Sequence, residues 1–228
     1  MMSAMRIKTA IRFLALAIPF LALTLPAQAP AAADPIFQID FSDPEQSPAQ
    51  WTLTLHPDGT GHFQSNPEKH GAGNQGIATP AVNRDVRLSA DYTKHAFDVA
   101  RTHKWFDMKC ESHLKVAFQG WKTLAYAGPE GQGSCTFNYS KDRDVEQLGD
   151  SLVAVAVTIF EGARLEVLLD HDRLGLDAEM EFLTEAAADG RAQQICAIRG
   201  ILERLAEDDG VLDRVRKRAR TLLEQSAT

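Results

Sequence analysis

The sequence predicts an α+β protein: an antiparallel sheet with one packed helix over residues 34–140, followed by an α-helical region over residues 141–228. The first part contains short segments that alternate apolar and polar residues and are separated by turn residues, which is typical of strands. From Asp144 to the end there is no proline, and apolar residues recur at helical spacing. We expect the long helix that begins near Asp144 to pack on the sheet, which would let the two parts share a core.

Residues 1–33 are predicted to be a cleavable secretory signal. An apolar run over 13–25 follows three positive residues, and small residues follow the run. The positive residues are Arg6, Lys8 and Arg12. The run is shorter than the roughly 20 residues that cross a bilayer as a helix. We expect cleavage after Ala33, with cleavage after Ala29 or an uncleaved anchor as alternatives. The mature chain of about 195 residues is then expected to be periplasmic or secreted, without a membrane span.

Strand character first appears at residues 36–41. The segments 51–56 and 61–64 are predicted to form a hairpin around Pro57-Asp58-Gly59, a typical turn sequence. A short strand is predicted at residues 86–88.

The one helix of the first part is predicted from Tyr92 to about His103, with Asp91 as its N-cap. Its apolar face consists of Tyr92, Ala96, Phe97 and Ala100. Trp105 and Phe106 follow the helix and are expected to anchor it in the core.

The clearest strand signals come next along the chain. A strand is predicted at 115–118, followed by an antiparallel pair at 122–126 and 135–139. The pair is expected to be joined by a loop rich in glycine and proline over residues 128–133.

Four helices are predicted after residue 140. The first carries a long apolar stripe: Leu148, Leu152, Val155, Ile159, Gly162, Leu165 and Leu169. Gly175 interrupts the pattern, and Asp177 is expected to cap a second helix that ends near Ala188. The third helix is expected to face inward with Ile195, Ile198, Leu202 and Leu205. The inward residues of the fourth are Val211, Val215, Ala219 and Leu222.

The chain contains three cysteines, and export to an oxidising compartment makes a disulfide the default for two of them. Cys110 and Cys135 are the favoured pair; they would close a loop worth about 3 kcal/mol in chain entropy. No bond, another pairing or a metal site are the alternatives. Cys196 lies in an apolar helical stretch and is expected to be a buried free thiol.

The charge of the chain disfavours nucleic acid as a partner. The formal charge of −7 becomes about −10 once the three positive residues of the signal are removed, and an acidic surface repels phosphate backbones. The basic run from Arg214 to Arg220 is expected to be a solvated, ion-paired helix face.

No cofactor and no metal site are expected. The run from Gly71 to Gly76 matches G-x-G-x-x-G, but it lacks the preceding strand and following helix that dinucleotide binding requires. Cys110 and His113 are spaced as metal ligands can be, but the other histidines are scattered and offer no second tight pair.

The densest polar cluster is the junction between the first two C-terminal helices. It comprises His171, Asp172, Arg173 and Asp177. Helix capping by Asp177 and an ion pair of Arg173 are the favoured interpretation, because both residue types commonly serve these purposes at helix ends. The alternative is a ligand or partner site at this junction.

The order of these elements resembles a known kind of domain. The features that carry the resemblance are Asp58-Gly59-Thr60-Gly61, the helix from Tyr92 to His103 with Trp105-Phe106, and the strand pair from Lys122 to Tyr139. Together they are similar to uncharacterised exported bacterial α+β domains. The resemblance implies a fold type and no catalytic residue.

These observations favour a non-enzymatic binding or interaction module of the cell envelope over an enzyme. The reason is that the sequence indicates an ordered, exported fold with a disulfide, but no group of reactive residues that would come together in one site. An envelope protein or a cell-wall component is the expected partner, and no catalytic residue is assigned. The alternative is a hydrolase whose site is assembled from distant residues near His171 and Asp172.

Overall fold

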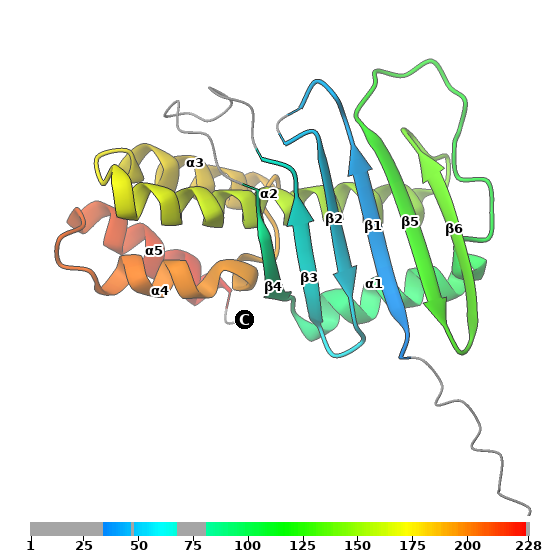
Figure 1. The fold of residues 1–228 in the computed structure, drawn as a ribbon, viewed down its shortest axis with the longest axis horizontal. Coiled ribbons are helices and arrows are strands. Elements are labelled where there is room, and N and C mark those ends of the chain that lie inside the picture. The colour runs from blue at the N-terminus through cyan, green and yellow to red at the C-terminus, as the bar shows by residue number, and fades with distance from the viewer. Residues whose placement is uncertain (1–33, 47, 68–80, 227–228) are drawn as a thin grey trace, which may run out of the picture. The chain divides into compact units, whose positions relative to one another are not determined.

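The computed structural model describes residues 34–46, 48–67 and 81–226, all of which lie in one compact unit from Ala32 to Thr228. The predicted signal lies outside the described residues. Six strands form one antiparallel sheet in the order β4-β3-β2-β1-β5-β6 (Figure 1). The α+β prediction, with helices gathered toward the C-terminus, is confirmed.

The elements have the following bounds. The strands are β1 (Ile36–Ser42), β2 (Gln50–Leu55), β3 (Thr60–Ser65), β4 (Asn83–Arg87), β5 (Trp121–Gly128) and β6 (Gly131–Phe137). The α-helices are α1 (Ala90–Thr102), α2 (Arg143–His171), α3 (Leu176–Asp189), α4 (Arg199–Glu207) and α5 (Asp213–Gln225). Two short 3-10 segments are η1 (Lys104–Phe106) and η2 (Ile195–Ile198).

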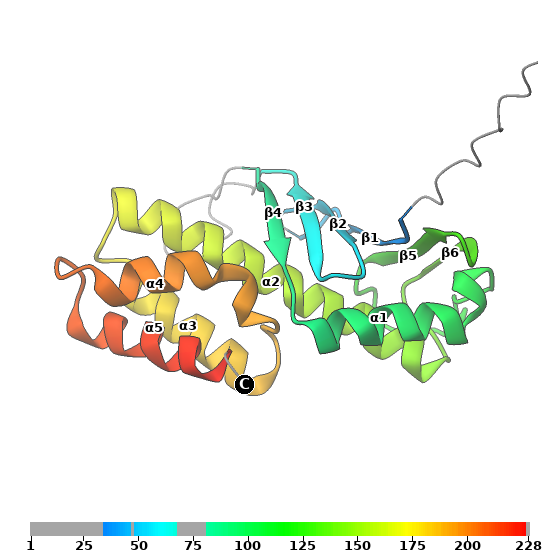
Figure 2. The same cartoon turned by 90° about the horizontal axis from the view of Figure 1, so that it is seen from below.

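The two faces of the sheet differ in character. Helices α1 and α2 lie against one face (Figure 2), and alternate residues of the strands are buried there. The intervening side chains of β1, β2 and β3 are exposed or half-buried. We call this second face the open face. Period-two alternation therefore places polar residues on it, because a strand points successive side chains to opposite sides.

Helix α2 belongs to two cores. Its residues from Val145 to Ala163 pack with the inward side chains of the sheet and of α1. Its residues Leu165, Leu168 and Leu169 pack with α3, α4 and α5. The 29 residues of α2 correspond to about 43 Å of helix, enough to reach across both clusters.

Two polar contacts stabilise α2: one caps its start, and the other joins it to the sheet. The side chain of Asp142 caps its start by accepting from the backbone N–H groups of Asp144 and Val145. Arg84 of β4 donates to both carboxylate oxygens of Glu166, at 3.1 and 2.6 Å. This bidentate pair ties the edge of the sheet to the helix.

The predicted disulfide is confirmed between Cys110 and Cys135, whose Cα atoms are 5.6 Å apart. Cys196 is free but half-buried, so its prediction as a buried thiol is wrong. The reason is that it sits in the short segment η2 rather than inside a helix, with Gln194 before it in a left-handed conformation. Partial burial raises the pKa of the Cys196 thiol.

Three local predictions need correction. Helix α1 is capped by Ser89, which accepts from the N–H of Tyr92, whereas the expected cap Asp91 lies in the first turn. The expected loop at 128–133 is a tight turn, because β5 runs to Gly128 and β6 begins at Gly131. Residues 115–118 are not a strand but an exposed segment without regular secondary structure.

None of the helices in the described part of the chain combines the length and the apolar character needed to traverse a bilayer.

Candidate binding surface on the open face of the sheet

Strand pairing aligns polar side chains into rows across the open face. One row crosses all six strands in register: Thr136, Thr123, Asp40, Thr52, Gln64 and Asn83. The neighbouring row is Ser134, Ala125, Gln38, Thr54, His62 and Asp85. Hydroxyl, amide and carboxylate groups from distant parts of the chain are thereby brought together by backbone register.

Asp40 lies at the centre of this array. Its Oδ1 accepts from the hydroxyl of Thr52 at 2.6 Å, and its Oδ2 accepts from the side-chain amide of Gln38 at 2.8 Å. Beside it, the hydroxyls of Thr123 and Thr136 lie 2.8 Å apart. These bonds hold the side chains in place, while each carboxylate oxygen keeps further acceptor capacity for a ligand.

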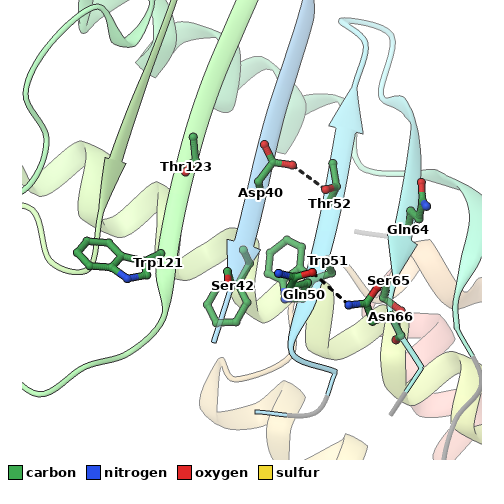
Figure 3. A pocket seen from close by; sticks show the side chains of 11 residues that line it. Asp40, Ser42, Gln50, Trp51, Thr52, Gln64, Ser65, Asn66, Trp121 and Thr123 are labelled. Carbon is green, nitrogen blue, oxygen red and sulfur yellow. Dashed lines mark hydrogen bonds between the residues drawn. The ribbon is translucent and has the colours of Figure 1, made fainter. Parts of the chain in front are cut away.

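A hollow of about 370 Å³ lies over one end of the array (Figure 3). Its lining residues come from β1, β2, β3 and β5 and from the start of the loop after β3: Asp40, Phe41, Ser42, Gln50, Trp51, Thr52, Gln64, Ser65, Asn66, Trp121 and Thr123. The amide of Asn66 donates to Gln50 Oε1 at 3.2 Å, which is the lower of the dashed lines in Figure 3. The hollow is therefore a shallow depression built on strands, with polar groups across its floor.

The margin of the hollow is aromatic. Trp121, the first residue of β5, is 45 % exposed and lies beside Ser42 and Thr123 in Figure 3. Its ring centroid is 5.8 Å from that of Phe118, which is also exposed. The indole thus offers an apolar surface and one N–H donor next to the polar array.

The array stands on a rigid layer of aromatic side chains beneath the sheet. The rings of Phe41 and Trp51 are 5.2 Å apart, and those of Trp51 and Phe63 are 5.8 Å apart, both in stacked orientation. All three side chains are buried. Well-packed strands position the groups above them more accurately than a loop could.

The chemistry of the hollow suits hydrogen bonding. Its lining residues include hydroxyl, amide and carboxylate groups, but no histidine, cysteine, lysine or arginine. A hydroxyl nucleophile normally needs an adjacent base that is itself oriented by a third group. In this hollow the carboxylate of Asp40 instead accepts hydrogen bonds from neutral side chains.

The four residues singled out in the sequence have different surroundings in the structure. His171 is exposed at the end of α2, and Asp172 is the C-cap, its N–H bonded to the carbonyl of Leu168. Arg173 forms an ion pair with Asp208 at 3.1 Å, as the favoured interpretation expected. These contacts serve the packing of α2 against the loop before α5, and they create no nucleophile–base pair among the four residues.

Asp177 does not cap α3, so this prediction is wrong. Gly175 occupies the cap position, and Asp177 in the first turn accepts from Arg214 at 2.5 Å and from Arg218 at 2.7 Å. The hydrogen bond from Arg214, supported by that from Arg218, lowers the pKa of Asp177. The two arginines draw the carboxylate toward α5, which makes it a bridge between helices.

The basic run of α5 is ion-paired as expected. Besides Arg214 and Arg218, Arg216 contacts Asp209 at 2.6 Å and Lys217 contacts Asp213 at 2.9 Å. The acids come from α3, from the loop before α5 and from α5 itself.

One polar cluster was not anticipated from the sequence. His103, at the end of α1, has Nδ1 3.1 Å from Asp142 and Nε2 3.3 Å from Asp144. These three residues could offer ligands to a metal ion, but the same contacts also join α1 to the start of α2. About forty residues separate the histidine from the acids, so no local spacing in the sequence indicated the cluster. The glycine-rich run from Gly71 to Gly76 lies outside the described residues.

No protein-family model matches this chain, and no curated protein matches its sequence. The functional interpretation therefore depends on the geometry of the chain itself.

Proposed function

We propose that the mature chain is a non-enzymatic binding module of the cell envelope that holds a cell-wall glycan on the open face of its sheet. The observation that carries the proposal is the hollow lined by hydroxyl, amide and carboxylate groups beside the exposed indole of Trp121. The proposal includes export, with residues 1–33 as the removed signal and the periplasm or the exterior as the destination.

The match to a glycan is chemical. A sugar ring presents hydroxyls around its edge and C–H groups on its face, so it needs hydrogen-bonding partners beside an apolar surface. Asp40 supplies a strong acceptor, and Gln50 and Asn66 supply amides. Trp121 supplies a flat ring of which nearly half is accessible.

The disulfide supports the proposed location outside the cytoplasm. The bond between Cys110 and Cys135 is of the kind that forms in oxidising environments outside the cytoplasm. It joins the segment that precedes β5 to β6, and so stabilises the edge of the sheet where Trp121 begins its strand.

Binding to isolated cell walls tests the proposal. The purified mature chain is incubated with peptidoglycan sacculi, and the retained fraction is measured after sedimentation; soluble wall fragments are then titrated by calorimetry. We expect Asp40→Ala to weaken binding about tenfold, the loss of one charge-assisted hydrogen bond. The matched control is Gln132→Ala, an exposed side chain of β6 on the same face but away from the hollow.

Two results would contradict the proposal. One is a wild-type chain that is not retained by the wall or by any of its fragments. The other is retention that Asp40→Ala and Gln132→Ala leave equally unchanged, since binding would then occur elsewhere on the molecule.

A further inference from the structure

The segment between the disulfide and β5 exposes apolar side chains to an unusual degree. Seven large apolar side chains of the described residues are exposed, and four of them lie close together in the sequence. They are Leu114 (50 % exposed), Val116 (41 %), Phe118 (49 %) and Trp121 (45 %). Single exposed apolar residues are ordinary, but a contiguous group on a protein surface usually marks an interaction site.

This segment, residues 113–119, is called the apolar loop below, and all its residues are exposed. It extends beyond the start of β5 (Figure 1). Its exposure is not a consequence of loose attachment, because both of its ends are held. Glu111 accepts from the N–H groups of His113 and Asn138, at 2.8 and 2.7 Å. The side chain of Asn138 accepts from the N–H of Gln119 and donates to the carbonyl of Ala117.

Covalent and steric constraints add to these hydrogen bonds. Cys110, bonded to Cys135, precedes the apolar loop. Gly120 follows it with φ 93° and lies against the ring of Phe41, where any side chain would collide. The fold therefore presents Leu114, Val116 and Phe118 to solvent from a fixed base, although exposing them gives no folding free energy.

The charge of the apolar loop is opposite to that of the protein. The chain carries 31 acidic residues and a formal charge of −7, yet no acidic residue occurs between Glu111 and Glu130. Lys115 projects from the middle of the loop and is exposed. The loop itself therefore carries a positive charge, which favours an anionic surface as its partner.

The backbone of the apolar loop is unsuited to pairing with another strand. His113 has φ 55°, and the N–H of Val116 bonds to the carbonyl of Leu114, which turns the chain within three residues. Strand addition needs a regular row of extended donors and acceptors. Hydrocarbon needs no directional contact, only accessible apolar area.

We propose that the apolar loop inserts into the surface of a lipid bilayer with anionic headgroups. Leu114, Val116 and Phe118 enter the outer hydrocarbon, Lys115 extends to the headgroups, and Trp121 lies at the interface. The two contacts share Trp121, which lines the hollow, but Leu114, Val116 and Phe118 do not, so variants of these three residues test the bilayer contact alone.

Vesicle binding by the full mature chain tests this inference. Vesicles of phosphatidylglycerol mixed with phosphatidylethanolamine are compared with vesicles of phosphatidylcholine, by sedimentation and by quenching of tryptophan fluorescence with brominated acyl chains. We expect binding to the anionic vesicles and quenching that Trp121→Phe removes, because Trp51 is buried and Trp105 half-buried.

The variants distinguish insertion of the apolar loop from nonspecific adsorption to the vesicles. Val116→Ser with Phe118→Ser should weaken binding at least tenfold, since each large apolar side chain that leaves water strengthens partitioning by about that factor. Lys115→Glu should weaken binding to anionic vesicles more than to neutral ones. The matched control is Leu174→Ser, which removes an 85 % exposed leucine in the turn between α2 and α3 and should change nothing.

Three results would overturn the inference. The first is a wild-type chain that binds neither kind of vesicle, and the second is a double serine variant that binds as the wild type does. The third is light scattering that shows a dimer which the double serine variant dissociates, since the apolar loop would then contact a second copy. None of these results depends on whether the open face binds a glycan.

Discussion

A buried arginine of α2 lies between two carboxylates, one of them on α3. Arg164 of α2 lies 3.2 Å from Glu161 and 3.1 Å from Glu179 of α3, and all three side chains are buried. An ion of this kind contributes little net stability when it is paired, but its loss leaves the opposite charges in a medium that solvates them poorly.

We expect Arg164→Met to lower the free energy of unfolding by about 3–5 kcal/mol, because two buried carboxylates would lose the guanidinium that contacts them. Urea denaturation measures the change. Arg204→Met is the control: Arg204 contacts Asp170 at 3.5 Å with both side chains about half exposed, and such pairs contribute at most about 1 kcal/mol. Equal losses in the two variants would contradict this account.

Asp177 gives a second prediction for a single residue, in the form of a pH dependence. Its pKa is lowered by Arg214 and Arg218, so the ionised carboxylate stabilises the folded state at neutral pH. That stabilisation is complete above the ordinary pKa of an aspartate, about 3.9, and is lost as the pH falls through the lowered pKa of the folded state.

Asp177→Asn should therefore be less stable than the wild type at pH 7, and the difference should shrink as the pH falls below about 4. Unfolding in urea at a series of pH values measures it. A difference that stays constant down to the acid transition would show that the charge of Asp177 is not what stabilises the contact.

At the scale of elements, the segment η1 is the least expected. Lys104, Trp105 and Phe106 have φ values of 55°, 61° and 64°, a left-handed run that costs roughly 1–2 kcal/mol for each such residue. Packing offsets this cost: Phe106 is fully buried, and Trp105 stacks on Tyr126 with ring centroids 4.6 Å apart. Glycine at 131 makes room for the indole, because a Cβ there would overlap the ring of Trp105.

We expect Gly131→Ala to destabilise the protein by about 1–3 kcal/mol through this collision. Gly200→Ala is the matched control, since a Cβ at 200 in α4 meets nothing within 4 Å. There the change should stabilise by up to about 1 kcal/mol, because alanine favours the helix. Thermal unfolding distinguishes the two, and shifts of the same sign would contradict the account.

Most elements could be predicted because their cause is local. Strands β1, β2 and β3 follow from alternation and from the turn chemistry at Asp58-Gly59, and α2 follows from its apolar stripe. The error at residues 115–118 also has a local cause: alternation of Lys115, Val116, Ala117 and Phe118 resembles a strand. Whether a partner strand lies beside such a segment depends on the rest of the chain, which a local pattern does not contain.

At the scale of the whole molecule, α2 couples two apolar clusters that would otherwise be separate. The sheet cluster and the C-terminal helical cluster are both completed by residues of this one helix. Unfolding of either cluster exposes part of α2, so the loss of one should weaken the other.

We therefore expect one cooperative unfolding transition. All three tryptophans, at 51, 105 and 121, lie in the sheet part, so their fluorescence follows that part alone, while far-UV circular dichroism follows the helices. The two curves should coincide in urea. Separate midpoints would show that α2 does not transmit stability between the clusters.

The candidate site could not be predicted because it is a property of the whole sheet. The polar residues of the open face were visible in the sequence as the alternate positions of each strand. Their alignment depends on β1 lying between β2 and β5, and β5 begins about eighty residues after β1 ends. Local patterns in the sequence indicated His171 and Asp172, which do not line the hollow on the sheet.

The central position of β1 also affects the order in which the sheet can assemble. A ribosome releases β1 first, and β2 can pair with one of its edges almost at once. The other edge has its partner only when β5 has been synthesised, so a nascent chain that ends before Trp121 carries an open strand in what becomes the middle of the sheet. Such edges invite pairing between molecules. Truncated chains that stop before β5 should consequently aggregate, whereas the full-length chain can close the edge on itself.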